Sequence, residues 1–295
     1  MNFDNTERTF GVELELILPE GMNPRELVRK LNDQFRNVTP LYWYGRIAAR
    51  QQVDFVRASY SNKDNLWRVK PDCSIQGRGR QGVEVVTPIL KGESDLATLK
   101  AVIAYLDHIG CTVNRSTGMH CHIDISDFNS HDLCRFMTLL AKYENAINAF
   151  LPNSRKGHNN SYCRNSFFGN ESLTEIYKDL EGRAIRGSRD ILNFNQFYGR
   201  GKWNFQNFLQ HGTFENRAHS GTVNADKVEH WVRLTMGLIS KAANDRIVPI
   251  ANGATTSHSQ YDSKSLLNCL ARNGHISSQT KRFMNKRAKE ISNAV

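Results

Sequence analysis

Long apolar stretches are missing from this chain of 295 residues. No segment approaches the roughly 18 uninterrupted apolar residues that suggest a membrane-spanning helix, so we expect no membrane partner. The beginning of the chain also lacks the basic segment followed by an apolar one that marks a secretory signal. From these two absences we expect a cytoplasmic protein.

Closely spaced cysteine pairs are missing as well. The chain has six cysteines but no CxxC pair, which argues against a thiolate zinc knuckle. An even number of cysteines is compatible with disulfides, but a long chain without a secretory signal favours free thiols in a reducing compartment.

Several familiar catalytic motifs are absent. The chain has no GxxxxGK[ST] phosphate loop and no GxSxG nucleophile elbow. The segment Gly77-Arg78-Gly79 is not followed by a helical pattern, so it is not a dinucleotide-binding fingerprint. If the protein acts on nucleotides, it does so through another kind of site.

The composition is that of an ordinary globular protein, with 39% hydrophobic and 23% charged residues. Strand-like and helix-like patterns alternate without a strict βαβ rhythm, which predicts an α+β fold. Asn23 and Pro24 indicate a helix start, and Asp226 is the expected cap of a later helix. We expect strands at 10–18, 66–69, 83–87, 120–125 and 212–217, helices at 94–108, 133–150, 226–240 and 266–288, and a loop or lid at 152–170.

The net charge of +10 is unevenly distributed. Residues 151–210 carry nine basic and five acidic side chains, and residues 241–295 carry nine and three. A basic surface attracts nucleic acid or other anionic polymers, although it can also be merely a solvated face. Both interpretations stay open for the C-terminal tail.

Three acidic residues occupy strand-like segments rich in apolar side chains. Glu13 and Glu15 are two apart, so both carboxylates point to the same face of one strand. Glu84 sits inside the apolar run 83–86, where a carboxylate needs a partner or a cation. Hard oxygen ligands of this kind suit Mg²⁺ or Mn²⁺, whereas the alternative is the solvent-facing side of a sheet.

The segment Gly118-Met119-His120-Cys121-His122 is the sharpest local signal. His120 and His122 share one strand face, an arrangement that builds metal or phosphate sites. Two surface histidines with ordinary partners are the alternative.

A later strand pairs an acid with an arginine. Glu215 and Arg217 lie on one face, and the planar guanidinium of arginine suits phosphate oxygens. An ion pair on a sheet is the alternative. Lys202 and Arg164 are further candidates for phosphate or carboxylate binding in a generally basic stretch.

Together these motifs resemble the carboxylate–amine ligases of the glutamine synthetase and glutamate–cysteine ligase superfamily, and most closely the amidoligase family of bacteria and phages. The matched segments are Gly11-Val12-Glu13-Leu14-Glu15, Gly118-Met119-His120-Cys121-His122, Glu215-Asn216-Arg217, Val69 to Ile75 and Val83 to Pro88. The likeness covers about residues 9–240, and a phage-encoded member would act in the host cytoplasm.

The resemblance implies a curved, mainly antiparallel sheet of the glutamine synthetase type, with helices packed outside. It also implies a reaction in which ATP phosphorylates a carboxylate and an amine then displaces the phosphate to form an amide. Residues 1–250 would be the catalytic domain, and 251–295 a basic, partly helical tail. The identities of the carboxylate and the amine, and the oligomeric state, stay open.

The resemblance also implies roles for individual residues. ATP and Mg²⁺ or Mn²⁺ would be the cofactors. The metal ligands would be Glu13, Glu15, Glu84, His120 and Glu215. His120 would also lie near the phosphates of ATP, and His122 would orient phosphate or substrate. Arg217 would stabilise the transferring phosphoryl group, with Lys202 and Arg164 as further candidates for that task.

Two other functions remain alternatives. A metal-dependent hydrolase could use His120 and His122 on zinc, but the strand with Glu13 and Glu15 that precedes them favours magnesium and ATP. A basic nucleic-acid-binding protein would account for the net charge, but it would not account for acids within apolar strands.

Overall fold

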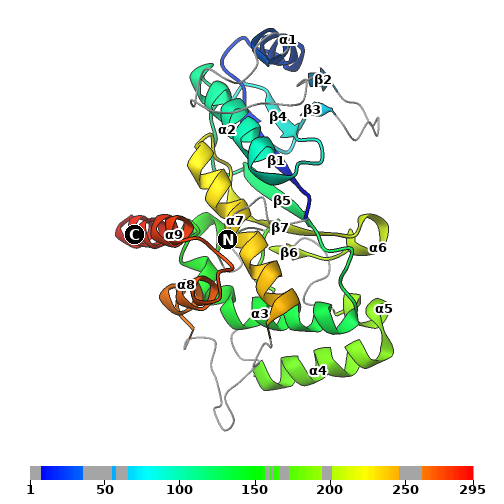
Figure 1. Cartoon of the computed structure of the whole chain (residues 1–295). Helices are drawn as coiled ribbons and strands as arrows, with labels where there is room; N and C mark the ends of the chain where they lie inside the picture. Colours follow the sequence, from blue (N-terminus) through cyan, green and yellow to red (C-terminus); the bar gives the residue numbers. More distant parts are fainter. Residues whose placement is uncertain are drawn as a thin grey trace. The chain divides into compact units, whose positions relative to one another are not determined.

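The computed structural model describes residues 8–35, 55–57, 66–156, 160, 162–166, 173–194, 201–245 and 261–294. The chain divides into two compact units. The first unit comprises Asn2–His122 and His219–Trp231, and the second comprises Ile123–Ala218 and Val232–Val295. Some helices and strands therefore contribute residues to both units. Figure 1 labels the helices and strands and colours them from the N-terminus to the C-terminus.

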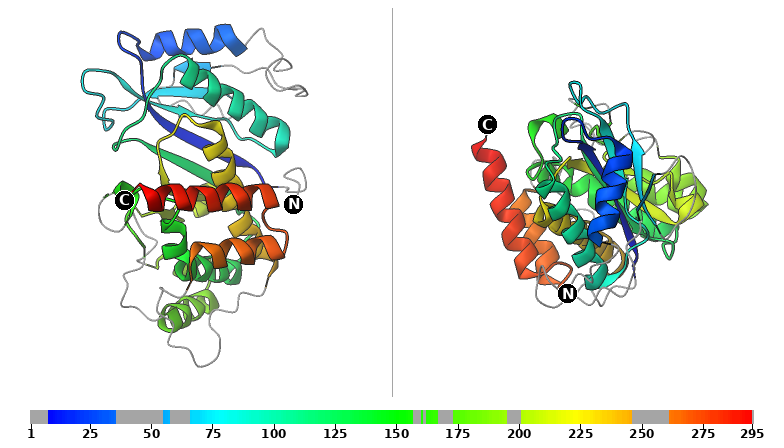
Figure 2. Two further views of the ribbon diagram at one scale, coloured as in Figure 1. Left: turned by 90° about the vertical axis from the view of Figure 1, so that its left-hand side faces the viewer. Right: turned by 90° about the horizontal axis from the view of Figure 1, so that it is seen from above.

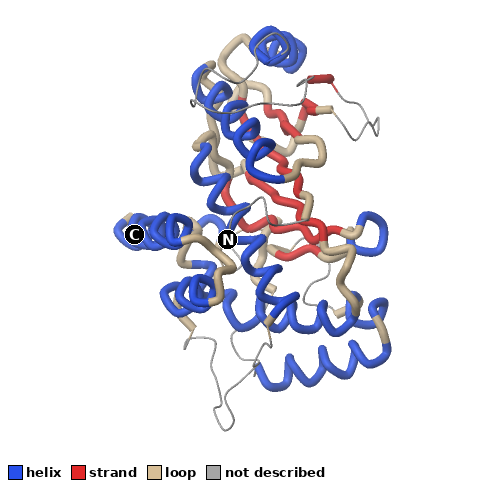
Figure 3. The backbone as a smooth tube through the Cα atoms, viewed as in Figure 1, coloured by secondary structure: helices blue, strands red, loops and turns tan. Residues whose placement is uncertain are grey.

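The first unit is built on strands that lie in the order β2-β3-β4-β1-β5. Pairing is antiparallel between β1 and β4 and between β3 and β4, and parallel between β2 and β3. Figure 3 shows β3, β4 and β1 side by side. The bounds are Phe10–Ile17 for β1, Phe55–Arg57 for β2, Trp67–Pro71 for β3, Gly82–Val86 for β4 and Gly118–Asp124 for β5, whose last two residues belong to the second unit.

Helices α1 (Pro24–Phe35) and α2 (Gly92–His108) complete the first unit, and α1 packs against β2 and β3. The Asn23 side chain accepts hydrogen bonds from the backbone N–H groups of Arg25 and Glu26 at 3.0 Å, which confirms it as the cap of α1. The strands expected at 66–69 and 83–87 are β3 and β4, and they pair antiparallel as a hairpin.

The second unit is mainly helical around α3. Helix α3 packs against α4, α5 and α8, and α8 packs against α9, which lies alongside it in Figure 2. The helices are α3 (Ser130–Asn148), a 3-10 turn (Asn153–Arg155), α4 (Leu173–Arg186), α5 (Ser188–Leu192), α6 (Phe208–His211), α7 (Ala225–Asn244), α8 (Ser263–Arg272) and α9 (Ser278–Asn293). The first turns of α7 belong to the first unit.

Two strands of the second unit position candidate residues. Strand β7 (Thr213–Ser220) pairs antiparallel with β6 (Trp203–Asn204), and its last two residues belong to the first unit. Behind them lies an aromatic cluster in which Phe136, Phe205 and Phe214 contact one another with ring centroids 4.8–5.6 Å apart. This packing fixes β6 and β7 against α3.

The α+β fold class is confirmed, and so are the antiparallel pairings. Two local expectations are wrong. Asn224, not Asp226, caps α7, because the Lys227 N–H donates to its side-chain oxygen at 3.0 Å. The single helix expected at 266–288 is two helices, since Gly274 takes a positive φ of 70° between them.

Other expectations are resolved in part. All six cysteines are free thiols. Within the described residues, no helix is long and apolar enough to span a bilayer. Much of the expected lid at 152–170 lies outside the described residues, and the division into 1–250 and 251–295 stays a prediction.

Candidate metal centre

One face of β1 carries the acids. Val12, Leu14 and Leu16 are almost completely buried on one side of the strand, whereas Glu13 and Glu15 are half-buried on the other. The antiparallel register sets Glu15 directly opposite Glu84 of β4. Three carboxylates of the first unit are therefore gathered on one side of two adjacent strands.

The histidines of β5 lie against the same carboxylates. His120 Nδ1 is 3.2 Å from Glu13 Oε2, and His120 Nε2 is 3.6 Å from Glu15 Oε1. His122 Nε2 is 3.3 Å from Glu13 Oε1. Glu13 thus lies between two imidazole rings, as the shared strand face of His120 and His122 predicts.

Two basic residues of β3, neither of them predicted from the sequence, also belong to this face. Lys70 pairs with Glu84 in the sheet register, and its ammonium lies 3.0 Å from Glu84 Oε2. Arg68 stands opposite Val86, the residue that pairs with Glu13. The signal that could have found them is the alternation of Trp67, Arg68, Val69 and Lys70, which gives β3 one apolar and one basic face.

Burial and neighbouring groups shift the pKa values of Glu84 and Glu13. Burial and the nearby carboxylate of Glu13 raise the pKa of Glu84 to about 7, against the opposing effect of Lys70. Burial also acts to raise the pKa of Glu13, but hydrogen bonding and charge from His120 and His122 outweigh it and hold that pKa well below its ordinary value. Two buried carboxylates are stabilised together when a cation lies between them.

The donor set fits a divalent cation. One ligand atom each from Glu13, Glu84 and His120 can be chosen so that all lie within 4.8 Å of one another. Two carboxylates and an imidazole suit Mn²⁺ well, and the oxygens suit Mg²⁺. Glu15 adjoins this set through His120, and its Oε2 accepts a hydrogen bond of 2.6 Å from the Gly118 N–H.

Glu215 and Arg217 lie together on β7 in the second unit. Arg217 donates to Glu215 Oε1, and the Asn204 amide donates to Glu215 Oε2 at 2.7 Å. Arg217 Nε is buried and has no hydrogen-bond partner among the described residues. The guanidinium therefore keeps one N–H donor for an added acceptor.

Lys202 is fully buried, unlike the exposed Arg164. Its ammonium donates to the side-chain oxygens of Asn148 and Asn165, and burial lowers its pKa to about 8. Its backbone joins the two other basic candidates, because its N–H donates to the Arg164 carbonyl at 3.1 Å and its carbonyl accepts from the Arg217 N–H at 2.8 Å. Binding or catalytic roles for Lys202 and Arg164 stay predictions.

The structure thus brings together five of the nine predicted residues, Glu13, Glu15, Glu84, His120 and His122, in the first unit. In the second unit, Glu215 and Arg217 lie on β7, and backbone hydrogen bonds of Lys202 join it to Arg164 and to Arg217. Every proposed metal ligand of the first unit has another member of the set beside it.

Comparison with known proteins identifies the family of the chain. No curated protein matches the chain. The sequence model of the family described as "Putative amidoligase enzyme" matches residues 6–239, well over half of the chain, and this range includes every candidate residue named above. The chain therefore belongs to the amidoligase family, and its function is of the ligase type.

Proposed function

We propose that the protein is an ATP- and Mg²⁺-dependent carboxylate–amine ligase of the glutamine synthetase type. The single observation that carries the proposal is the convergence of Glu13, Glu84 and His120 on one point of the sheet. A family of amide-forming ligases supplies the reaction class. Phosphoryl transfer depends mainly on positioning and on neutralising charge, for which this donor set is suited.

The proposed reaction has two steps. A carboxylate oxygen of the first substrate attacks the γ-phosphorus of ATP, and ADP leaves with the electrons of the broken P–O bond. The amine of the second substrate then attacks the acyl carbon, loses a proton and displaces inorganic phosphate. The product is an amide.

Glu13, Glu84 and His120 would hold the divalent cation, with Glu15 as a further candidate ligand. A metal-binding role for Glu215, on β7 of the second unit, stays a prediction. The cation would neutralise charge on the phosphates. Of the remaining residues, His122 would orient a phosphate or substrate oxygen from its place beside Glu13. Lys70 and Arg68 add positive charge on the same face of the first unit.

Arg217 is the proposed stabiliser of the transferring phosphoryl group. Its buried Nε has no hydrogen-bond partner among the residues that the structure describes, and Glu215 holds its Nη1. An arginine that is held at one nitrogen and has a second N–H open can donate to a phosphate oxygen without first losing side-chain freedom.

The test is a calorimetric titration of the full chain with ATP, with and without Mg²⁺. We expect Mg²⁺-dependent binding that weakens by about tenfold or more in Glu13→Gln and in Arg217→Ala. Glu26→Gln on α1 and the exposed Arg272→Ala are matched controls in the first and second units and should bind as the unchanged protein does.

The outcome also separates the alternatives. If ATP binds, acid and amine pairs can be screened by release of ADP. If ATP fails to bind while Zn²⁺ binds tightly and is lost in His120→Ala, the ligase proposal is wrong and a zinc hydrolase takes its place. If Glu13→Gln binds ATP as tightly as the unchanged protein does, the proposal that this metal centre takes part in ATP binding is wrong.

A further inference from the structure

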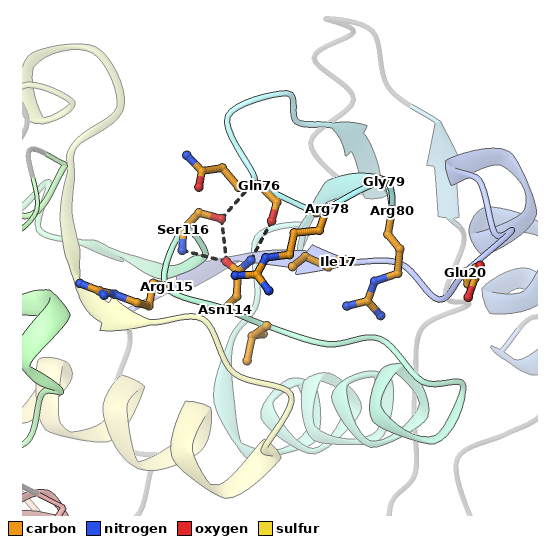
Figure 4. A pocket seen from close by; sticks show the side chains of 11 residues that line it. Ile17, Glu20, Gln76, Arg78, Gly79, Arg80, Asn114, Arg115 and Ser116 are labelled. Atoms are coloured by element: carbon orange, nitrogen blue, oxygen red, sulfur yellow. Dashed lines mark hydrogen bonds between the residues drawn. The ribbon is translucent and has the colours of Figure 1, made fainter.

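The first unit contains a pocket of about 820 Å³ that is lined by none of the candidate metal-centre residues. Its walls are the loop 76–80 between β3 and β4, the loop 113–116 between α2 and β5, Ile17 at the end of β1, and Glu20 (Figure 4). None of the motifs that point to the ligase reaction includes these two loops.

The pocket is rich in arginine. Arg78, Arg80 and Arg115 line it, and Glu20 is the one acidic residue among its lining residues. Within the described part of the chain, neither Arg78 nor Arg115 has a hydrogen-bond or ion-pair partner. Figure 4 shows Arg78 and Arg80 extending from the same loop in a similar direction, whereas Arg115 points away from them.

The loop that carries Arg78 and Arg80 has an unusual backbone conformation. Arg78 and Gly79 both have positive φ, 51° and 88°, and the Arg80 N–H donates to the Gly77 carbonyl at 3.2 Å. This is the pattern of a tight turn with two left-handed central residues. A Cβ atom on Gly77 would lie 2.0 Å from the Arg80 carbonyl oxygen, so only glycine fits there.

Arg78 is the only non-glycine residue with a positive φ among the described residues. Asparagine or glycine would occupy such a position at lower conformational cost. The turn itself is not stabilised by a long cationic side chain at this position. Its use is more readily explained by a ligand than by local structure.

The second loop is fastened to the first. The Asn114 amide donates to the Gln76 carbonyl at 2.8 Å, and the Gln76 N–H donates to Ser116 Oγ at 2.9 Å. Arg80 is held by a 2.9 Å hydrogen bond from its Nη2 to Thr112 Oγ1. The pocket is therefore formed before any ligand arrives, which lowers the entropic cost of binding.

The pocket adjoins the candidate metal centre along β1. Ile17 is two residues beyond Glu15 on the same strand face, about 7 Å along the strand. The loop 113–116 leads directly into Gly118, whose N–H donates to Glu15. A small molecule with two functional groups spans such a distance.

We propose that this pocket binds an oxyanionic group, a carboxylate or a phosphate, that is carried by the substrate at a distance from its reacting carboxylate. Arg78 and Arg80 bind the anion through the planar N–H forks that match carboxylate and phosphate oxygens. The assignment of the anion to the substrate rests on the proposed ligase function. The binding of an oxyanion in the pocket does not.

The first experiment measures anion binding to the full chain without metal or ATP. Inorganic phosphate and tricarballylate are titrated by calorimetry at low ionic strength, up to about 10 mM. We expect at least one of them to bind, and Arg78→Gln and Arg80→Gln each to weaken it by about tenfold. The anion that binds more tightly identifies a phosphorylated or a polycarboxylate substrate.

A matched control separates the pocket from general surface charge. Arg25→Gln removes an exposed arginine of α1 that does not line the pocket. It should change the affinity less than twofold. Circular dichroism identifies any variant that fails to fold. Arg78→Lys keeps the charge without the planar fork, and it should bind less tightly than the unchanged protein but more tightly than Arg78→Gln.

A second titration links the pocket to the metal centre. With Mn²⁺ present, glutarate should bind more tightly than butyrate, and Arg78→Gln should remove that advantage while leaving Mn²⁺ affinity unchanged. The proposal that the pocket binds an oxyanion is overturned if Arg78→Gln and Arg80→Gln bind the anions as tightly as the unchanged protein does. It is also overturned if neither anion binds. If anions bind through these arginines but glutarate has no advantage, the pocket stands and its assignment to the substrate is wrong. If the unchanged protein does not bind Mn²⁺, the result counts against the proposed function and leaves anion binding in the pocket untouched.

Discussion

Glu15 of β1 and Glu84 of β4 are direct cross-strand partners in an antiparallel pair. Like charges in this position destabilise a sheet unless a cation or a proton compensates them. The structure provides partial compensation, because His120 lies beside Glu15 and Lys70 lies beside Glu84. The remaining deficit of positive charge is what makes this face a candidate site for a divalent cation.

The stability of the metal-free protein should depend on Glu84. Burial raises its pKa from the ordinary 4.5 to about 7, so between these values the folded state binds more protons than the unfolded state. Its contribution to stability is full below pH 4.5 and is lost as the pH rises through 7, by about 3 kcal/mol in all. Urea unfolding should find Glu84→Gln more stable than the unchanged protein at pH 8, with a much smaller difference at pH 5. A difference that does not change with pH would contradict this.

Divalent cations should stabilise the folded chain. A ligand that binds only the folded state at about 100 times its Kd adds about 2.7 kcal/mol. We expect Mn²⁺ to raise the Tm of the unchanged protein and of Glu26→Gln, and to have little effect on Glu13→Gln or His120→Ala. Scanning calorimetry with increasing Mn²⁺ is the measurement. An undiminished rise in Glu13→Gln would exclude this carboxylate as a ligand.

The buried charge of Lys202 should lower the free energy of unfolding at neutral pH. Burial lowers its pKa from 10.5 to about 8, so the unfolded state binds more protons between these values. Its unfavourable contribution is therefore full below pH 8 and is relieved as the pH rises towards 10.5. The free energy of unfolding of the unchanged protein, relative to Lys202→Met, should increase over this range. A constant difference would mean that Asn148 and Asn165 fully compensate the buried charge.

Asp245 should hold the end of α7 to the segment between α8 and α9. Its Oδ2 accepts hydrogen bonds from Lys241 Nζ at 2.8 Å and from the Asn273 amide at 2.6 Å, and it lies 2.9 Å from His275 Nε2. Burial acts to raise its pKa, but these contacts outweigh it and hold the pKa well below the usual range. We expect Asp245→Asn to lower the free energy of unfolding by about 2 kcal/mol at pH 7.

The effect of Asp245 should fade at low pH. A carboxylate with a lowered pKa contributes stability above its unfolded value near 4, and that contribution is lost as the pH falls through the folded pKa. Urea titrations of both proteins at pH 7 and at about pH 3 test the sign. A larger difference at the lower pH would be inconsistent with this assignment.

The basic tail should be tested by neutralising charges, because deletion would expose apolar side chains. Leu266, Leu267 and Leu270 of α8 are completely buried. Arg282, Lys286 and Lys289 are exposed and share one face of α9 by their spacing. If the tail binds nucleic acid, changing all three to Gln should weaken binding of a single-stranded oligonucleotide and reduce its salt dependence. Fluorescence anisotropy measures both, and Mn²⁺ binding should be unaffected.

Much of the site could be predicted because strand alternation is a local property. Glu13 with Glu15, and His120 with His122, are each two residues apart, so their shared faces follow from the backbone period alone. Local rules also found the cap at Asn23. They failed at Asp226 because Asn224, two residues earlier, offers the same capping chemistry.

Other features depend on contacts between distant segments. The opposition of Glu15 and Glu84 requires the register of β1 on β4, which a shift of one residue would reverse. The same register places Arg68 and Lys70 on the acidic face. The sequence around these two residues does not predict which residues they pair with. The pocket of Arg78 and Arg80 likewise needs a second loop, whose Asn114 and Ser116 bond to Gln76.

By itself the sequence determined the types of element, the faces on which the acids and histidines lie, and the family. Each of these depends on residue identity and spacing within a few positions. Only the tertiary structure decided which faces meet, which charges compensate one another, and where the arginine pocket forms. The physical reason is that register and loop packing are chosen by the burial of the whole core, to which residues far apart in the chain contribute together.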